Sequence, residues 1–147
     1  MPDSKRKQIT DAIISAVSGV TGMGKVTQDE EDWARADGQD LPICFVAIQK
    51  PAVLRVYFEH PTADDMEAEL AMRISCQSLS EFGSTKRADV DALMKNIEIA
   101  LAADSAVEAL VLDLHLVSDT IDIGSSENRG FCYLDYTGAY QYNHATP

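Results

Sequence analysis

Basic residues are scarce in this 147-residue chain, and their scarcity excludes two classes of protein. Lysine and arginine number 12 against 24 aspartates and glutamates, which gives a formal net charge of −12. The basic residues are scattered, with Lys5-Arg6-Lys7 as their one cluster. We therefore expect neither sequence-specific nucleic-acid binding nor docking on an anionic membrane, since both need a positive surface. Acidity of this degree favours solubility and repulsion between neighbouring molecules.

Long apolar runs and paired cysteines are also missing. No apolar stretch approaches the roughly 20 residues that cross a bilayer. Met1 leads into Pro2-Asp3-Ser4 rather than into a signal peptide. The cysteines are odd in number and widely spaced, at Cys44, Cys76 and Cys132, which is typical of a reducing compartment. Each lies among apolar neighbours, so we expect three buried thiols that act as small hydrophobic side chains in a cytoplasmic protein.

What the chain does contain is a regular order of elements, and its length suits a single domain over residues 1–147. Apolar residues recur at helical spacing in two segments and alternate in several shorter ones. The predicted helices cover residues 5–20 and 86–103. The predicted strands cover residues 25–27, 43–48, 53–59, 70–76, 110–117 and 130–142. Residues 28–40 carry six acids against one arginine, and we expect them to form an exposed, mobile loop.

This order predicts an α+β fold. The three strands between residues 43 and 76 are joined by short turns, which suggests an antiparallel meander. Two amphipathic helices and one dominant sheet favour two layers. The predicted architecture is a mixed, mostly antiparallel sheet with both main helices packed on one face.

One motif resembles a nucleotide site. Residues 19–25 (Gly-Val-Thr-Gly-Met-Gly-Lys) satisfy the first seven positions of the phosphate-binding P-loop. The next position needs a hydroxyl for Mg²⁺, and this chain has Val26 there. A P-loop also runs from a strand into a helix, so that helix N–H groups point at phosphate. This segment leaves a predicted helix and enters a predicted strand, so we expect no nucleotide binding.

The sequence predicts no catalytic, cofactor-binding or metal-binding residues. His60, His115 and His144 are far apart, and none has metal-ligand spacing. The acidic run Asp29–Asp32 lacks the glycine and the terminal glutamate of a calcium loop. No Gly-x-Ser-x-Gly motif is present. We therefore expect a protein that is not an enzyme.

Aromatic residues gather near the C-terminus. Phe131, Tyr133, Tyr136, Tyr140 and Tyr142 are half of the ten aromatics in the chain. On a strand, Tyr136 shares a face with the apolar core positions, whereas Phe131 and Tyr133 share the opposite face. The core accounts for one face. We expect a partner subunit to cover the other, because tyrosine and tryptophan are enriched at interfaces.

Taken together, the order of elements resembles the tail-terminator and minor tail proteins of long-tailed phages and prophages. The matching features are the amphipathic helix around Ile9 and Ile13, and Leu41-Pro42 before an apolar strand. Two further matches are the end of the second helix, at residues 97–104, and the segment 112–119, which contains Leu112-Asp113-Leu114 and Ser118-Asp119. The aromatic strand at residues 131–136 completes the match.

The resemblance implies a structural subunit of a homo-hexameric ring that caps the tail tube and joins it to the head. Its partners would be copies of itself, the tube protein and the head–tail connector. It would be found in the bacterial cytoplasm during assembly and in the virion tail afterwards. The family supplies no catalytic residues or cofactors. The alternatives are a head-completion or neck protein, a small enzyme with an aromatic-lined pocket, and a monomeric binding module.

Overall fold

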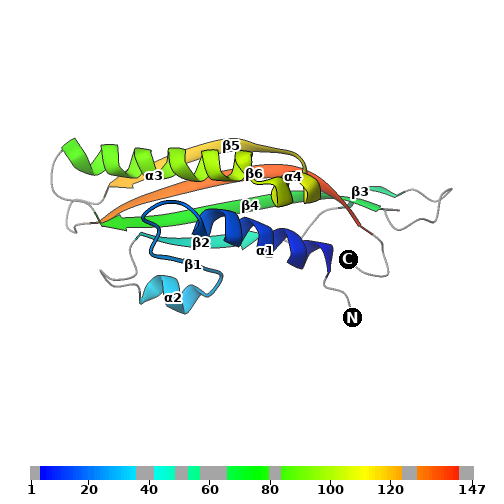
Figure 1. The fold of residues 1–147 in the computed structure, drawn as a ribbon, viewed down its shortest axis with the longest axis horizontal. Helices are drawn as coiled ribbons and strands as arrows, with labels where there is room; N and C mark the ends of the chain where they lie inside the picture. The colour runs from blue at the N-terminus through cyan, green and yellow to red at the C-terminus, as the bar shows by residue number, and fades with distance from the viewer. Residues whose placement is uncertain are drawn as a thin grey trace.

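The computed structural model describes residues 4–35, 42–48, 53–56, 66–79, 84–123 and 129–142. These residues form four helices and six strands (Figure 1). The helices are α1 (Lys5–Ser18), α2 (Glu30–Ala34), α3 (Ser84–Ala103) and α4 (Ser105–Leu110). The strands are β1 (Lys25–Thr27), β2 (Ile43–Ile48), β3 (Val53–Val56), β4 (Met66–Leu79), β5 (Leu112–Ile123) and β6 (Arg129–Tyr142).

The sheet is built on its two longest strands. β4 and β6 have 14 residues each and pair in antiparallel register along their whole lengths. The strand order is β1-β2-β4-β6-β5, with β3 paired to β4 beside this path. β1 is parallel to β2, and the other pairs are antiparallel. The predicted α+β class, with a mixed and mostly antiparallel sheet, is therefore confirmed.

The predicted meander of three strands is wrong. β2 pairs with residues 72–77 of β4, whereas β3 pairs with residues 66–68 of the same strand. The alternation in residues 70–76 locates the middle of β4 but not its full length. Because β4 has 14 residues, its one edge has room for both partners.

Three helices cover one face of the sheet, which is called the inner face below. α1 packs near β1 and β2, and α3 packs near β6 and β5, as Figure 1 shows. α4 lies between them and contacts both helices. The core lies between the facing surfaces of the two layers. Its buried apolar residues include Ile9, Ile13 and Val17 of α1; Val90, Ile97 and Leu101 of α3; Leu70, Ile74 and Cys76 of β4; and Cys132, Leu134 and Tyr136 of β6. The two main helices thus lie on one face, as predicted.

Two short helices were not predicted. The N-cap of α2 is Asp29, whose side chain accepts a hydrogen bond from the Glu31 amide at 2.9 Å. The N-cap of α4 is Asp104, which accepts from the Val107 amide in the same way. The interpretation of residues 28–40 as a loop is therefore wrong for Glu30–Ala34, and residues 36–40 lie outside the described residues.

The start of β5 crosses β6 unusually closely. The register shifts between Leu112 and His115, and Asp113 has a positive φ of 52°. Aspartate tolerates this left-handed conformation better than most residues with a side chain. Gly138 of β6 lies under this bulge. A Cβ atom there would lie 3.0 Å from Val111 Cγ1, 3.1 Å from the Leu112 carbonyl oxygen and 3.3 Å from Leu114 Cα.

We expect Gly138→Ala to lower the free energy of unfolding by about 1–3 kcal/mol, because the added methyl group overpacks the β5–β6 crossing. Gly19→Ala is the matched control, since its Cβ would be no closer than 3.4 Å to any atom and Gly19 has φ of −77°. Urea denaturation of both variants measures the difference. Equal stabilities would contradict the close crossing.

Candidate functional site

The face of the sheet that α1, α3 and α4 leave uncovered is the candidate functional surface, and it is called the outer face below. Its described members alternate along each strand with the buried core residues. They are Phe45 and Ala47 of β2, Glu69, Ala71, Arg73, Ser75 and Gln77 of β4, and Phe131, Tyr133, Asp135 and Thr137 of β6.

α2 covers one end of the outer face. The Trp33 ring lies 6.2 Å from the ring of Phe45 and 6.5 Å from that of Phe131, between centroids. Gln77 Nε2 donates a hydrogen bond to the Trp33 carbonyl oxygen at 3.2 Å. Part of the cover over Phe131 therefore comes from α2 of the same chain, and a partner subunit on the rest of this face stays a prediction. A five-residue helix has too little periodicity to be recognised from sequence.

A charged network occupies the middle of the outer face. Arg73 forms two hydrogen bonds with Asp135, at 2.8 and 3.2 Å, and Ser118 of β5 donates a third to the same carboxylate at 3.0 Å. The guanidinium group also lies 5.4 Å from the centroid of the Tyr133 ring. The Arg73 hydrogen bonds lower the pKa of Asp135, so the carboxylate stays ionised. Sequence gave no signal for this network, since Arg73 and Asp135 are brought together by strand register.

Beside this network the outer face is hollowed. A shallow depression of about 780 Å³ extends across β2, β4, β6 and β5. It is lined by Ala47, Glu69, Ala71, Met72, Arg73, Val117, Asp135, Tyr136 and Thr137. A second hollow of about 430 Å³ lies among α3, α4 and β5. Among the described residues, Tyr136 is the one tyrosine, phenylalanine or tryptophan that lines these hollows, and it lines both.

The P-loop-like segment is occupied by structural contacts. It leaves α1 and enters β1, as predicted. The backbone N–H groups of Gly24 and Lys25 both donate to the Pro42 carbonyl oxygen, at 2.9 and 3.2 Å. The Lys25 ammonium group lies 3.4 Å from Asp32. The groups that would hold phosphate therefore hold β1 beside β2 and α2.

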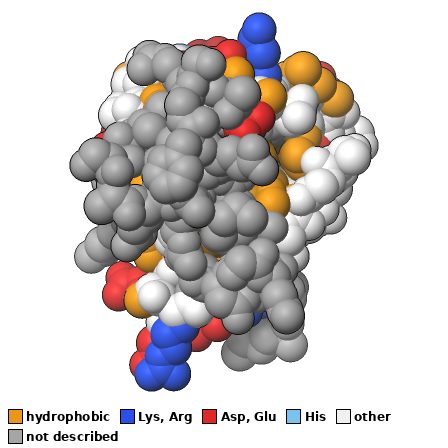
Figure 2. Space-filling model, turned by 90° about the vertical axis from the view of Figure 1, so that its left-hand side faces the viewer, with side chains coloured by type: hydrophobic (Ala, Val, Ile, Leu, Met, Phe, Trp, Pro, Cys, Tyr) orange, Lys and Arg blue, Asp and Glu red, His pale blue; other side chains and the backbone are white. Residues whose placement is uncertain are grey.

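The acidic run Asp29–Asp32 also has structural contacts. The Asp29 carboxylate caps α2, and the Thr27 hydroxyl donates to Asp32 at 2.9 Å. This hydrogen bond lowers the pKa of Asp32, and the nearby Lys25 acts in the same direction. Figure 2, viewed from the left-hand side of Figure 1, shows acidic and basic side chains together near the lower rim of the molecule. The described residues contain no group of three histidine, cysteine or acidic side chains that could hold a metal ion.

The three cysteines lie in one row across the sheet. Cys44, Cys76 and Cys132 face one another in register on β2, β4 and β6, and all are free and buried. The Cys44 and Cys76 sulfurs are 2.7 Å apart, and the Met23 sulfur lies 3.6 Å from Cys44. Burial raises the pKa of the Cys76 thiol well above its ordinary value. The Cys76 thiol is thus a protonated core group at neutral pH.

His115 is the one histidine among the described residues. It is more than half exposed, and its Nδ1 lies 2.8 Å from the Asp113 carbonyl oxygen at the β5 bulge. His60 and His144 lie outside the described residues. Among the helices that the structure describes, none is long and apolar enough to span a bilayer.

Comparison with known proteins identifies no family. No family model matches the chain, and no curated protein matches it. One solved structure that aligns with it is a chain described as part of the "Virion of native gene transfer agent (GTA) particle". The alignment covers 94% of this chain and 92% of that one, with 13% identity and a TM-score of 0.40. A TM-score of this size does not establish a shared fold, and no function is transferred from it.

We expect the glycine segment not to bind nucleotide. The Gly24 and Lys25 amides are already hydrogen-bonded, and Val26 cannot ligate Mg²⁺. Isothermal titration calorimetry with Mg-ATP should show no binding heat. The variant Lys25→Ala should give the same flat titration. A micromolar dissociation constant for the unaltered protein, lost in this variant, would contradict the prediction.

We expect all three cysteines to remain thiols in protein purified without added oxidant. A disulfide-exchange reagent should react slowly with the native protein, because each side chain is at most 1% exposed. The same reagent should titrate three thiols once the protein is unfolded. Cys132→Ser should lower that count to two. A count below three in the unaltered, unreduced protein would show that a disulfide had formed.

Proposed function

We propose that this chain is a non-enzymatic virion assembly protein, a tail terminator that forms a homo-hexameric ring on the end of a phage tail tube. The observation that carries the proposal is the outer face of the sheet. Beyond α2, no described element packs on it, and its broad hollow of about 780 Å³ is open. A surface of this breadth and shallowness suits a protein partner better than a small molecule, which binds in an enclosed, mostly apolar pocket.

The arrangement of elements supports the same proposal. The features on which the resemblance rests are an N-terminal amphipathic helix, an apolar strand, a long second helix and a closing aromatic strand. They are α1, β2, α3 and β6 of the structure, and they form one two-layer unit. Capping a tube requires copies that contact one another and the tube end. Both contacts use protein surface and need no catalytic group.

The charge of the chain suits a ring through which DNA passes. Each subunit has a formal net charge of −12. A lumen lined by carboxylates repels phosphate and lets DNA slide without binding. On this proposal the partners are the tube protein and the head–tail connector, and assembly takes place in the bacterial cytoplasm.

We expect a monomer–hexamer equilibrium that shifts toward the ring as protein concentration rises. It should also shift as salt increases from low to physiological strength, because salt screens repulsion between subunits beyond about 8–10 Å. Size exclusion with light scattering measures the mass, and negative-stain microscopy shows the rings. A monomer under every condition, with no binding to tail tubes, would contradict the proposal.

A second experiment separates the terminator from the neck-protein alternative. Purified tube protein is polymerised with and without this chain, and tube lengths are measured by microscopy. A terminator should bind tube ends and shorten the length distribution, whereas an unrelated acidic protein of similar mass should not. Unchanged tube lengths, together with binding to the head connector, would favour a head-completion or neck protein.

A further inference from the structure

The described part of the fold leaves few large apolar side chains exposed, and one of them lies at the start of the edge strand β5. Among the described residues, the exposed large hydrophobic side chains are Ile99 of α3 and Leu112 and Val117 of β5, which are 64%, 47% and 63% exposed. β5 is the last strand of the sheet, and its described strand partner is β6. Val117 lines the hollow of the outer face, whereas Leu112 lies at the start of β5, beside its first register shift. Among the described residues no strand pairs with the outer edge of β5, so Leu112 is an exposed apolar residue on a strand edge, a common place for protein contacts.

The shape of β5 disfavours the addition of another strand to this edge. Its register shifts twice, between Leu112 and His115 and between Leu116 and Ser118. Bulges interrupt the regular hydrogen-bonding row that a new strand would need, and they protect edges from strand pairing. The partner of this surface is therefore expected to contact side chains rather than extend the sheet.

The first bulge also presents a charged side chain on this edge. The Asp113 side chain is 93% exposed and follows directly after the exposed Leu112. The neighbouring carboxylate is Glu108 of α4, which is exposed and lines the same hollow as Asp113. His115 lies beside the bulge, with its ring against the Asp113 carbonyl group. This surface calls for a basic partner that also offers apolar contact.

The same chain carries such a surface on its opposite side. A hollow of about 290 Å³ at the start of α1 is lined by Ser4, Arg6, Lys7, Thr10, Asp11, Gln28 and Ile48. Arg6 and Lys7 belong to the one basic cluster of the sequence, and Ile48 supplies an apolar wall. Lys7 forms an ion pair with Asp11 at 2.7 Å, so the exposed Arg6 is the principal positive group for a partner.

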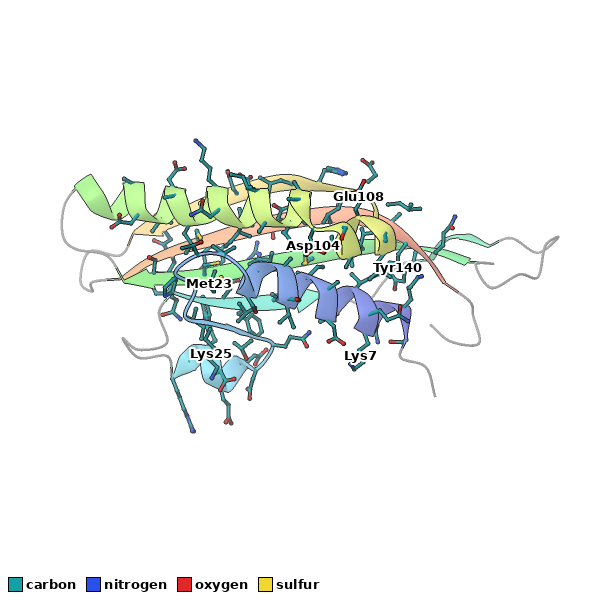
Figure 3. The ribbon with its side chains drawn as sticks, viewed as in Figure 1. Lys7, Met23, Lys25, Asp104, Glu108 and Tyr140 are labelled. Carbon is teal, nitrogen blue, oxygen red and sulfur yellow. The ribbon has the colours of Figure 1, made fainter. Side chains whose placement is uncertain are left out.

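The two surfaces cannot meet within one molecule. Ile48 belongs to β2, near one edge of the sheet, whereas β5 is the opposite edge, with β4 and β6 between them. In Figure 3, Lys7 points to the lower side of the molecule and Glu108 lies toward the upper side. A contact between them joins different surfaces of two copies. Such heterologous contacts build a ring when the rotation closes.

We propose that the β5 bulge at Leu112-Asp113 of one copy seats in the α1 hollow of the next copy, with Asp113 facing Arg6. This inference rests on the proposed function, because it names the surfaces by which the ring would form. The basic cluster Lys5-Arg6-Lys7 then has a role in an otherwise acidic protein. It neutralises the acidic β5 edge of a neighbouring copy, where two subunits with net charges of −12 come into contact. Complementary charges also select one register among many approaches.

Charge reversal at the two positions tests the contact. Arg6→Glu and Asp113→Lys should each raise the dissociation constant for self-association roughly tenfold or more. The double variant should recover most of the loss, because the pair is restored with its signs exchanged. The matched controls are Arg35→Glu and Asp122→Lys, which change the net charge equally at exposed positions outside the contact. Both controls should assemble like the unaltered protein.

Asp113 has a positive φ, so a lysine there risks local strain. Asp113→Asn removes the charge and keeps a residue that adopts this conformation readily. It should weaken association in the same direction but less. Thermal unfolding of every variant checks that the fold is kept.

Sedimentation equilibrium distinguishes failure of the proposed contact from failure of the proposed function. If the unaltered protein forms rings and the Arg6 and Asp113 variants form them equally well, this contact is wrong while the proposed function stands. If the reversals weaken assembly and the double variant recovers nothing, the pairing of Arg6 with Asp113 is also wrong. If the unaltered protein stays monomeric at all concentrations and fails to bind tubes, the proposed function and this inference both fall.

Discussion

The ladder between β4 and β6 determines which side chains face the helices and which face outward. Both strands have 14 residues and pair over their whole lengths, so a single register fixes the two faces of the sheet. A slip by one residue would move Ile74 and Leu134 from the core to solvent. Burial of such side chains stabilises the fold by about 1.5–3 kcal/mol each, so this register is strongly specified. The helices, the cysteine row and the Arg73–Asp135 pair all depend on it.

The two faces of the sheet that this register produces differ in composition and in cover. The inner face is continuous and apolar, and three helices shield it from water. The outer face mixes aromatic, small and charged residues, and among the described residues the cover on it is α2, where Trp33 meets Phe45 and Phe131. Arg73 lies against both Tyr133 and Asp135. Arg73 and Asp135 thus satisfy each other's hydrogen bonds on the part of this face that no described element covers.

The sequence predicted the elements that carry a long or regular pattern. The bounds of β1 and β2 were predicted without error, and those of α1, α3 and β6 within two residues, because apolar spacing and the caps are local properties. α2 and α4 were missed because helices of five and six residues show less than two turns of periodicity. Their caps, Asp29 and Asp104, were the available signals. The position of β3 and the Arg73–Asp135 pair depend on which strands become neighbours, and no local pattern contains that information.

The polar groups of the sequence motifs share one feature in the structure: they form contacts within the fold. A ligand site needs polar groups that the fold leaves unsatisfied and aims at a shared point. In this chain the Gly24 and Lys25 amides bind Pro42, the Asp29 carboxylate caps a helix, and the buried thiols contact one another. What remains available for binding is the exposed surface of the fold. The exposed Leu112-Asp113 segment at one edge and the basic hollow near the other lie on opposite sides of one copy, so one small two-fold contact does not engage both. On the proposed function, head-to-tail repetition brings the first surface of each copy against the second surface of the next, and this is the kind of contact that closes a ring.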